Sequence, residues 1–271
     1  MDLIEPKPLM PEQDKSLGAR TAAAQDEQAA ARAVREMFSA IAPRYDLLNH
    51  VLSLNTDRYW WWRAARTFRY ILRRPGAAVL DVCCGTGDMA FALYRRAGPL
   101  PRNANAPGGV RIVGADFSPA MLERARQKGA GLPLEWIEAD ALNLPFADGT
   151  FDLVVSAFGF RNLANYDRGL GEIGRVLKSG GEIGILDFGE PQGVTGKLYQ
   201  LYFRHVLPRL GTIISGVRGP YAYLPASVAR FPEPEEMLAR MRRAGFERAE
   251  YAPYTFGIAG LYRAVKRTAE Q

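Results

Sequence analysis

The stretch VLDVCCGTGDMA, residues 79–90, joins an apolar run to a helical pattern through two glycines. Apart from Asp81, the run is continuously apolar, which is typical of a strand buried on both faces. Gly85 permits a tight turn, and Gly87 allows backbone to approach a ligand closely. Ala90 even stands where the dinucleotide-binding pattern has its third glycine. The stretch therefore decides the fold class as α/β, but the loop alone identifies no ligand.

Strand and helix patterns alternate after this loop. Continuous apolar strands separated by helices predict a parallel sheet covered on both faces. Two strand patterns around Gly257 predict a hairpin at the end of the chain. The other expected strands cover residues 77–84, 110–117, 133–139, 151–158 and 181–188, and the expected helices cover residues 22–42, 57–73, 87–97, 118–127, 167–177 and 233–246.

Acidic residues follow the second and third strands. Asp116 can accept hydrogen bonds from both ribose hydroxyls of an adenosine. The alternative is that it caps the next helix, although Ser118 is the better-placed cap. Asp140 suits a hydrogen bond to an adenine amino group, with Ala141 offering its backbone N–H. For Asp140 taken alone, an Asx-turn within the loop is an equally good interpretation.

The order of these features resembles the class I methyltransferases that use S-adenosylmethionine. The resemblance combines the acid, strand and glycine loop with FDLVVS (residues 151–156), RVLKSGGEIGILDF (residues 175–188) and the closing hairpin. It implies a Rossmann-like, mostly parallel seven-stranded sheet that ends in an antiparallel hairpin. It also implies S-adenosylmethionine as the cofactor and no metal.

Segments outside this core resemble the quinone-ring C-methyltransferases of the menaquinone and ubiquinone pathways. They are MFSAIAPRYDLLNHVLSLNTDRYW (residues 37–60), LPFADGTFDLVVSAFGFRNL (residues 144–163) and YAYLPASVARFP (residues 221–232). The resemblance implies methylation of a ring carbon of a polyprenylated quinol, with demethylmenaquinol as the preferred substrate. A ubiquinone-pathway benzoquinol and a soluble phenol remain the alternatives. The cofactor-binding residues that we expect are Asp81, Gly85, Thr86, Gly87, Asp116, Asp140, Ala141 and Ser156.

The segment FGFRNL, residues 158–163, leaves the fourth strand at the edge where ligands bind in such sheets. Arg161 and Asn162 can therefore reach the substrate from a rigid frame. The ring carbon is a better nucleophile when its hydroxyl is deprotonated, and a free phenol has a pKa of about 10. A guanidinium near that oxygen would stabilise the developing anion. The alternative is that Arg161 only braces the loop by pairing with Asp152 or Asp167.

A general base is not evident. The chain has two histidines, His50 and His205, and each is more readily explained as a structural residue. The family resemblance puts Tyr45 over the active site, where we expect it to line the pocket. Cys83 and Cys84 stand where common members of the family carry two glycines. Direct methyl transfer needs no cysteine nucleophile, so we expect this departure to change packing only.

Composition limits the binding partners and the cellular location that we expect. The 271 residues are 48% hydrophobic and carry a net charge of +6, which suits nucleic acid or anionic lipid without choosing between them. The two cysteines are adjacent, which predicts no disulfide and a cytoplasmic location. The first residues lack the layout of a signal peptide, and no stretch has 18 uncharged apolar residues.

We expect a disordered tail over residues 1–20, a helical cap over residues 21–75 and a methyltransferase domain over residues 76–271, with a lid insertion over about residues 191–232. A polyprenyl substrate lies in a membrane, and two basic, aromatic segments could contact its inner face. For RYWWWRAARTFRYILRR (residues 58–74), packing on the sheet is the favoured interpretation, since three consecutive tryptophans cannot all face one side. For KLYQLYFRHVLPRLG (residues 197–211) we favour a substrate lid.

Two other classes of protein were weighed. Enzymes that methylate exocyclic amino groups of nucleic acids commonly carry an Asn/Asp-Pro-Pro-aromatic turn after the fourth strand, whereas SAFGFRN (residues 156–162) has no proline. We therefore expect no nucleic-acid partner. A cofactor-binding protein without catalysis would keep the fold, but the Arg161–Asn162 pair argues against it. A homodimer is left open.

Overall fold

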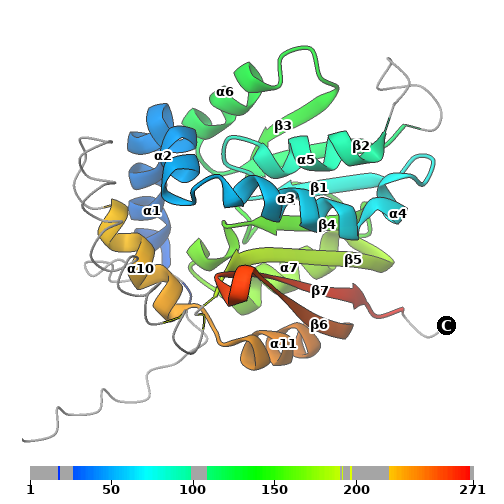
Figure 1. The fold of residues 1–271 in the computed structure, drawn as a ribbon. Coiled ribbons are helices and arrows are strands. Elements are labelled where there is room, and N and C mark those ends of the chain that lie inside the picture. Colours follow the sequence, from blue (N-terminus) through cyan, green and yellow to red (C-terminus); the bar gives the residue numbers. More distant parts are fainter. Residues whose placement is uncertain are drawn as a thin grey trace, which may run out of the picture.

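The computed structural model describes residues 18, 27–98, 109–189, 191, 196 and 220–268. Its centre is a seven-stranded sheet in the order β3-β2-β1-β4-β5-β7-β6, in which β7 alone runs antiparallel to its neighbours on both sides (Figure 1). This confirms the mostly parallel sheet and the terminal hairpin. The strands are β1 (Ala78–Val82), β2 (Arg111–Asp116), β3 (Leu134–Glu138), β4 (Phe151–Ala157), β5 (Leu177–Phe188), β6 (Phe246–Tyr254) and β7 (Ala259–Lys266).

Helices cover both faces of the sheet, as continuous apolar strands require. Alternate residues of a strand point to opposite faces. Leu80 and Val82 of β1 accordingly join the core under α7 and α11, whereas Val79 joins the core under α3, α4 and α5. The helices are α1 (Glu27–Ile41), α2 (Tyr45–Leu52), α3 (Thr56–Thr67), α4 (Arg69–Leu72), α5 (Asp88–Ala97), α6 (Pro119–Lys128), α7 (Tyr166–Val176), α10 (Pro220–Arg230) and α11 (Pro234–Arg243).

Short turns complete the edge at which the parallel strands end. They are the 3-10 turns η1 (Ala42–Arg44), η2 (Phe160–Asn162) and η4 (Thr255–Gly257). Figure 1 shows α1, α2 and α10 gathered at this edge, with α3 running from it across the front of the sheet. The edge is therefore covered by elements that come from both ends of the chain.

The structure differs from the sequence-based expectations in a few boundaries. The helix expected over residues 57–73 is broken at Phe68, whose buried ring packs over Gly184 where a Cβ would lie 2.5 Å from it. β5 begins at Leu177 rather than at residue 181, and α2 was not expected as a separate helix.

Other expectations lie wholly or partly outside the described residues. They are the N-terminal tail, most of the lid insertion including residues 197–211, and His205. Within the described residues, α10 occupies the end of the segment that we expected to be a lid insertion. No described helix combines the length and the apolar character needed to cross a bilayer.

Candidate functional site

A cavity of about 360 Å³ lies at the carboxyl edge of the sheet, under α1, α2, α3 and α10. Its walls include nine of the eleven residues that the sequence predicted for the site, so the fold brings together side chains that are far apart in the chain. Those nine are Tyr45, Asp81, Gly85, Thr86, Asp116, Asp140, Ala141, Arg161 and Asn162. Gly87 and Ser156 are not among the lining residues.

The glycine loop makes the tight turn that its sequence predicted. Gly87, which we expected to let the backbone approach a ligand, instead makes room for a side chain of the protein. Gly85 has φ 54° and Gly87 has φ 88°, both in the left-handed region. A Cβ on Gly87 would lie 2.5 Å from the Trp136 ring. The missing side chain thus makes room for packing of β3 against α5. Cys83 also takes a left-handed backbone, with φ 55°, in a chain position where a glycine would be unstrained.

Asp81, on β1, has an unsatisfied hydrogen-bond acceptor and lines the cavity. Its Oδ2 accepts a hydrogen bond from the Ala90 N–H at 3.0 Å, while its Oδ1 is buried and has no partner among the residues that the structure describes. Burial raises the pKa of this carboxyl well above its usual value. A bound ammonium group would supply both a donor and a countercharge. The amino acid end of S-adenosylmethionine fits this position.

Asp116, at the end of β2, is held in place by backbone. Its Oδ2 accepts from the Gly85 N–H at 2.8 Å, and its Oδ1 accepts from the Ser118 N–H at 2.9 Å. The side chain of Ser118 caps α6 by accepting from Met121, so Asp116 is not the cap. Burial raises the pKa of Asp116 to about 6. Hydroxyl donors from a ribose would favour its ionised form.

Asp140 and Ser156 differ in exposure and in their position relative to the cavity. Asp140 is exposed, and its Oδ1 accepts from the Leu142 N–H at 2.9 Å, which is the Asx-turn alternative. It still lines the cavity together with Ala141. Ser156 is 1% exposed, and its Oγ is buried without a partner. It lies behind the wall, next to Gly159.

Arg161, in η2, is buried, bonds to other residues of the protein and also lines the cavity. Its Nη1 lies 2.9 Å from Asp187 Oδ1 and also donates to the Phe158 carbonyl. Its guanidinium carbon lies 5.1 Å from the centre of the Phe188 ring. Its Nε is buried and has no hydrogen-bond partner among the described residues, so this N–H is unsatisfied.

The two predicted ion pairs of Arg161, with Asp152 or with Asp167, were wrong. Asp152 pairs with Lys178 at 2.8 Å, and Asp167 pairs with Arg240 at 2.8 Å. The actual partner is Asp187, at the end of β5. The signal was present in the strand GILDF, because an acid at the carboxyl end of a buried strand faces the ligand edge.

Asn162 connects η2 to the helical cover. Its Oδ1 accepts from the Tyr223 hydroxyl of α10 at 3.0 Å, and its Nδ2 reaches the Phe158 carbonyl at 3.5 Å. Tyr223 also lines the cavity, although it was not among the site residues that the sequence predicted. A substrate ring in the cavity would therefore meet a polar pair that spans two elements.

The α2 helix contributes Tyr45 and is clasped to the core by charge. Burial raises the pKa of the Tyr45 phenol, which keeps it protonated at neutral pH. Next to it, Asp46 pairs with Lys128 at 3.0 Å, and Lys128 also pairs with Asp88 at 2.8 Å. Lys128 further donates to Thr86 at 3.0 Å. The clasp joins the C-terminus of α6 to the glycine loop and to α2.

Aromatic rings close the other side of the cavity. Trp60 is 2% exposed and lies 5.7 Å from Phe158 and 6.1 Å from Phe188, measured between ring centres. Packing is thus confirmed for Trp60 and for Trp61, which is 9% exposed, whereas Trp62 faces outward. The sequence did not indicate that Trp60 would also line the site.

The described lining of the cavity contains no histidine. His50 is connected to the cavity through Asp57, a buried residue that lines it. The Nδ1 of His50 lies 2.8 Å from Oδ2 of Asp57. Within the described part of the chain, His, Cys, Asp and Glu form no group of three that could hold a metal ion.

The chain was compared with known proteins. The model of the ubiE/COQ5 methyltransferase family matches residues 23–266. A demethylmenaquinone methyltransferase of Deinococcus radiodurans is 49% identical over 245 residues, covering 89% of this chain and 96% of the relative. Another, of Thermus thermophilus, is 48% identical and covers 83% and 98%. A ubiquinone/menaquinone biosynthesis C-methyltransferase of Geobacter sulfurreducens is 42% identical and covers 86% and 88%.

Solved structures resemble the fold at low sequence identity. An S-adenosylmethionine-dependent methyltransferase of Thermotoga maritima has a TM-score of 0.57 at 20% identity and covers 86% of this chain and 99% of its own. The [4+2]-cyclase SpnF has a TM-score of 0.61 at 18% identity and covers 94% and 100%. These likenesses concern the fold alone, since proteins that share a fold can differ in chemistry.

Proposed function

Since the chain belongs to the ubiE/COQ5 methyltransferase family, we propose that it methylates a ring carbon of a polyprenylated quinol, with demethylmenaquinol as its preferred substrate. Family membership makes it an S-adenosylmethionine-dependent methyltransferase. The observation that carries the proposal is that one cavity is lined by Asp81 and Asp116, by Arg161 and Asn162, and by aromatic rings. Polar groups suited to the cofactor and rings suited to a quinol meet there.

The cofactor fits one half of the cavity. When bound, S-adenosylmethionine supplies an electrophilic methyl group on a sulfonium. Asp81 would hold the amino group through its unpartnered Oδ1, and Asp116 would accept from the ribose hydroxyls. Asp140 and Ala141 would meet the adenine, and the loop of Gly85 and Thr86 would pass beneath the ligand.

The quinol fits the other half, between the aromatic wall and η2. Arg161 Nε would donate to the ring oxygen and stabilise the anion that develops as the hydroxyl loses its proton. Asn162 and the protonated Tyr45 phenol would orient the ring through further hydrogen bonds. Holding the ring carbon close to the methyl group supplies much of the remaining acceleration. The aromatic wall excludes water and strengthens these electrostatic interactions.

The proton of the hydroxyl has a route through Asp57. This carboxyl lines the cavity and bonds His50 at 2.8 Å, and His50 is partly exposed. We propose that the hydroxyl proton passes, directly or through water, to Asp57 and His50, and that the hydrogen displaced from the methylated ring carbon leaves as a proton while the ring oxygen regains one. Tyr45 is unsuited as the acceptor, because burial raises its pKa.

The proposed preference for the naphthoquinol is supported only by the names of the relatives. The relatives at 49% and 48% identity are demethylmenaquinone methyltransferases, whereas the one at 42% identity carries both quinone pathways in its name. A benzoquinol of the ubiquinone pathway is therefore the second candidate substrate. We also propose peripheral contact with the inner face of the cytoplasmic membrane, where such substrates lie. The homodimer stays a prediction, which analytical ultracentrifugation tests.

The test is a methyl-transfer assay on the purified protein. Labelled S-adenosylmethionine is incubated with demethylmenaquinol, with the demethylated benzoquinol and with a simple soluble phenol, and label is followed into each extracted product. We expect the naphthoquinol to be labelled fastest. Faster labelling of the benzoquinol would move the protein to the second candidate. Labelling of the phenol alone, or of nothing, would end the proposal.

A further inference from the structure

Two apolar side chains stand in water at the mouth of the cavity. Leu54, between α2 and α3, is 79% exposed, and Phe256, in η4, is 82% exposed. Leu54 itself lines the cavity, as does Thr255 beside Phe256. The indole N–H of Trp60 donates to Thr255 Oγ1 at 2.7 Å, so η4 is held against α3. We refer to Leu54 and Phe256 as the rim.

The backbone of the rim is strained. Leu54 has φ 52° and Asn55 has φ 60°, while Thr255 and Phe256 have φ 46° and 57°. The left-handed region is disfavoured for residues other than glycine, and strained backbone clusters at functional sites. Glycine or asparagine would fit these turns better. At two of the four positions, Leu54 and Phe256, the residue is instead a large apolar one whose side chain is exposed, which indicates a use for these side chains.

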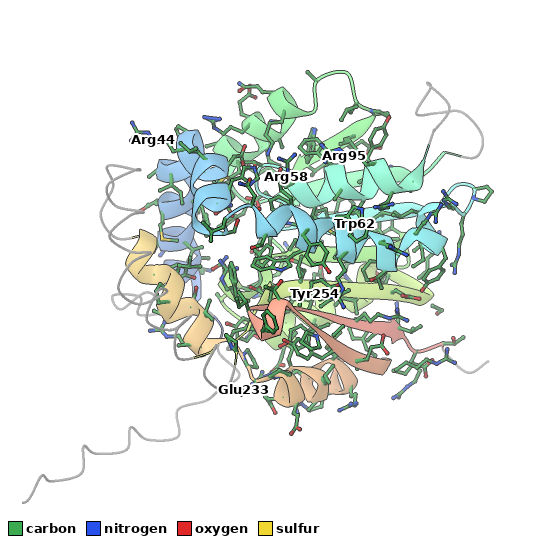
Figure 2. The ribbon with its side chains drawn as sticks, in the orientation of Figure 1. Arg44, Arg58, Trp62, Arg95, Glu233 and Tyr254 are labelled. Carbon is green, nitrogen blue, oxygen red and sulfur yellow. The ribbon has the colours of Figure 1, made fainter. Side chains whose placement is uncertain are left out.

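A basic, aromatic surface continues from the rim along α3 and α4. Residues 54–76 contain six arginines and a single acid, Asp57, which is 3% exposed. Tyr59 stacks on Trp62 with ring centres 6.0 Å apart, and both are more than 40% exposed. Figure 2 shows Arg58, Trp62 and Tyr254 on the side of the molecule that faces the reader. The six arginines are Arg58, Arg63, Arg66, Arg69, Arg73 and Arg74.

The arginines and rings also contact one another. Arg66 and Arg96 lie over the Trp62 ring, at 5.4 Å and 4.9 Å from its centre. Arg63 lies 4.1 Å from the centre of the Tyr254 ring, which belongs to the strand that leads into η4. Tyr254 itself is 1% exposed, so this contact ties α3 to the strand before η4 beneath the surface.

We propose that this surface docks the mouth of the cavity on an anionic lipid bilayer. The arginines meet headgroup phosphates, Tyr59 and Trp62 lie at the level of the headgroups, and the rim enters the acyl region. A substrate tail then passes from lipid to cavity without crossing water. The inference rests on the proposed function for its reason, since only a greasy substrate needs such a path.

Charge and shape favour lipid over RNA as the partner. An RNA-binding surface also combines arginines with aromatic rings, but it stacks bases on those rings. Here the Trp62 ring already contacts Tyr59 and two arginines, and the most exposed large hydrophobic residues described are an aliphatic and an aromatic one at a cavity mouth. Such groups gain free energy from burial in acyl chains.

Vesicle flotation tests the surface on the full chain. Vesicles of phosphatidylcholine are compared with vesicles that also contain phosphatidylglycerol, at low and high salt. We expect binding to the anionic vesicles at low salt. Leu54→Asn with Phe256→Asn should weaken it at least about tenfold, and asparagine suits the left-handed backbone of both residues. Arg58→Gln with Arg66→Gln should weaken it by about fivefold per arginine.

Matched controls lie away from this surface. Leu132→Asn removes an apolar residue that is 38% exposed before β3, and Arg126→Gln with Arg242→Gln removes two exposed charges on α6 and α11. Neither control should change flotation. Wild-type protein that fails to float with anionic vesicles, or variants that float as the wild type does, would overturn the proposal. Binding to RNA without binding to vesicles would overturn it as well.

A second arm separates docking from chemistry. Phe256→Asn and Arg58→Gln with Arg66→Gln are assayed on a demethylated naphthoquinol without a tail in solution, and on the long-tailed quinol in vesicles. We expect unchanged turnover of the soluble ring and at least about tenfold slower turnover in vesicles. If the wild type methylates neither substrate, the proposed function fails, and flotation still decides whether the surface binds lipid.

Discussion

At Arg161 the guanidinium serves the protein and the cavity together. Nη1 holds the buried Asp187 carboxylate and the Phe158 carbonyl, which fixes the direction of the Nε–H. A buried ion pair contributes little net stability, but breaking one leaves a charge without compensation. The pairing therefore positions the group that would act on the substrate, and bracing and catalysis are parts of one arrangement.

The first prediction separates these two roles. Arg161→Met should lose turnover, by about 100- to 1000-fold, because a donor to the developing oxyanion is gone. It should also destabilise the fold by about 3–5 kcal/mol, because Asp187 is left unpaired. Combining it with Asp187→Asn should recover much of the stability and none of the turnover. Steady-state kinetics and urea unfolding measure the two effects, with the Kd for S-adenosylmethionine as the control. Turnover near the wild-type rate in the stable double variant would rule out the catalytic role.

The second prediction concerns the pKa of Asp116. Burial raises it to about 6, so the folded protein without ligand favours the protonated carboxyl more than the unfolded chain does. The sign follows: ionised Asp116 costs stability as the pH rises through 6, and a ribose that donates to it recovers that cost. Affinity for S-adenosylmethionine should therefore fall as the pH drops below about 6, by up to tenfold per pH unit. Calorimetric titration from pH 5 to 8 checks this. Asp116→Asn, as the control, should bind weakly, and its own contribution to the pH dependence should vanish.

Among the elements, α2 depends most on charge for its position. It supplies Tyr45 to the cavity, and Lys128 at the end of α6 ties Asp46 of α2 to Asp88 of α5. Burial raises the pKa of Asp88, and Lys128 lowers it. Without the lysine, two carboxylates would face each other beside the glycine loop.

The third prediction follows from this clasp. Lys128→Met should weaken S-adenosylmethionine binding by about fivefold, because Thr86 and Asp46, the neighbour of Tyr45, lose their contacts with the lysine. The effect should shrink at high salt, where ion pairs between partly exposed groups are screened. Arg126→Met is the matched control on the same helix, since its contact with Glu123 is 3.9 Å long and exposed. Equal losses in both variants would mean that the clasp plays no part in alignment.

The extent to which the elements could be foreseen depended on their periodicity. Each expected strand of the sheet lies within a few residues of its position, because a continuous apolar run bounded by glycine or a helix has few other interpretations. The break at Phe68 was missed because it depends on the fit of one ring over Gly184, which local sequence does not encode. The partner of Arg161 was misjudged although GILDF places Asp187 at the carboxyl end of a strand, because strand order decides which strand end lies beside η2. The cavity-lining residues from the glycine loop and strand ends were found, since those positions follow from topology.

On the scale of the whole molecule, the N-terminal helices share a core with the sheet. Phe68 is 0% exposed and belongs to the same buried cluster as Val79 of β1, Leu153 of β4 and Leu261 of β7. The boundary that we predicted between residues 75 and 76 remains a prediction, but no separate core for α3 and α4 stands beside it in the described residues.

The fourth prediction is that α3, α4 and the sheet unfold together. Phe68→Ala should lower the free energy of unfolding by about 3–5 kcal/mol, because it leaves a cavity between helix and sheet. Tryptophan fluorescence reports mainly α3, which carries three of the four tryptophans, whereas circular dichroism reports the whole fold. The two transitions should coincide in urea for the wild type and the variant. A fluorescence transition that precedes the other would show the helices leaving an intact sheet, and Leu132→Ala serves as the surface control.

Cys83 and Cys84 both line the cavity, where a quinol ring is proposed to bind. The oxidised form of such a ring is an electrophile that alkylates thiolates. Burial raises the pKa of both thiols well above its usual value, and the nearby carboxylates of Asp116 and Asp81 raise it further. At neutral pH the pair consequently stays protonated and poorly nucleophilic. A low thiolate fraction would slow alkylation of either sulfur by a quinone bound there.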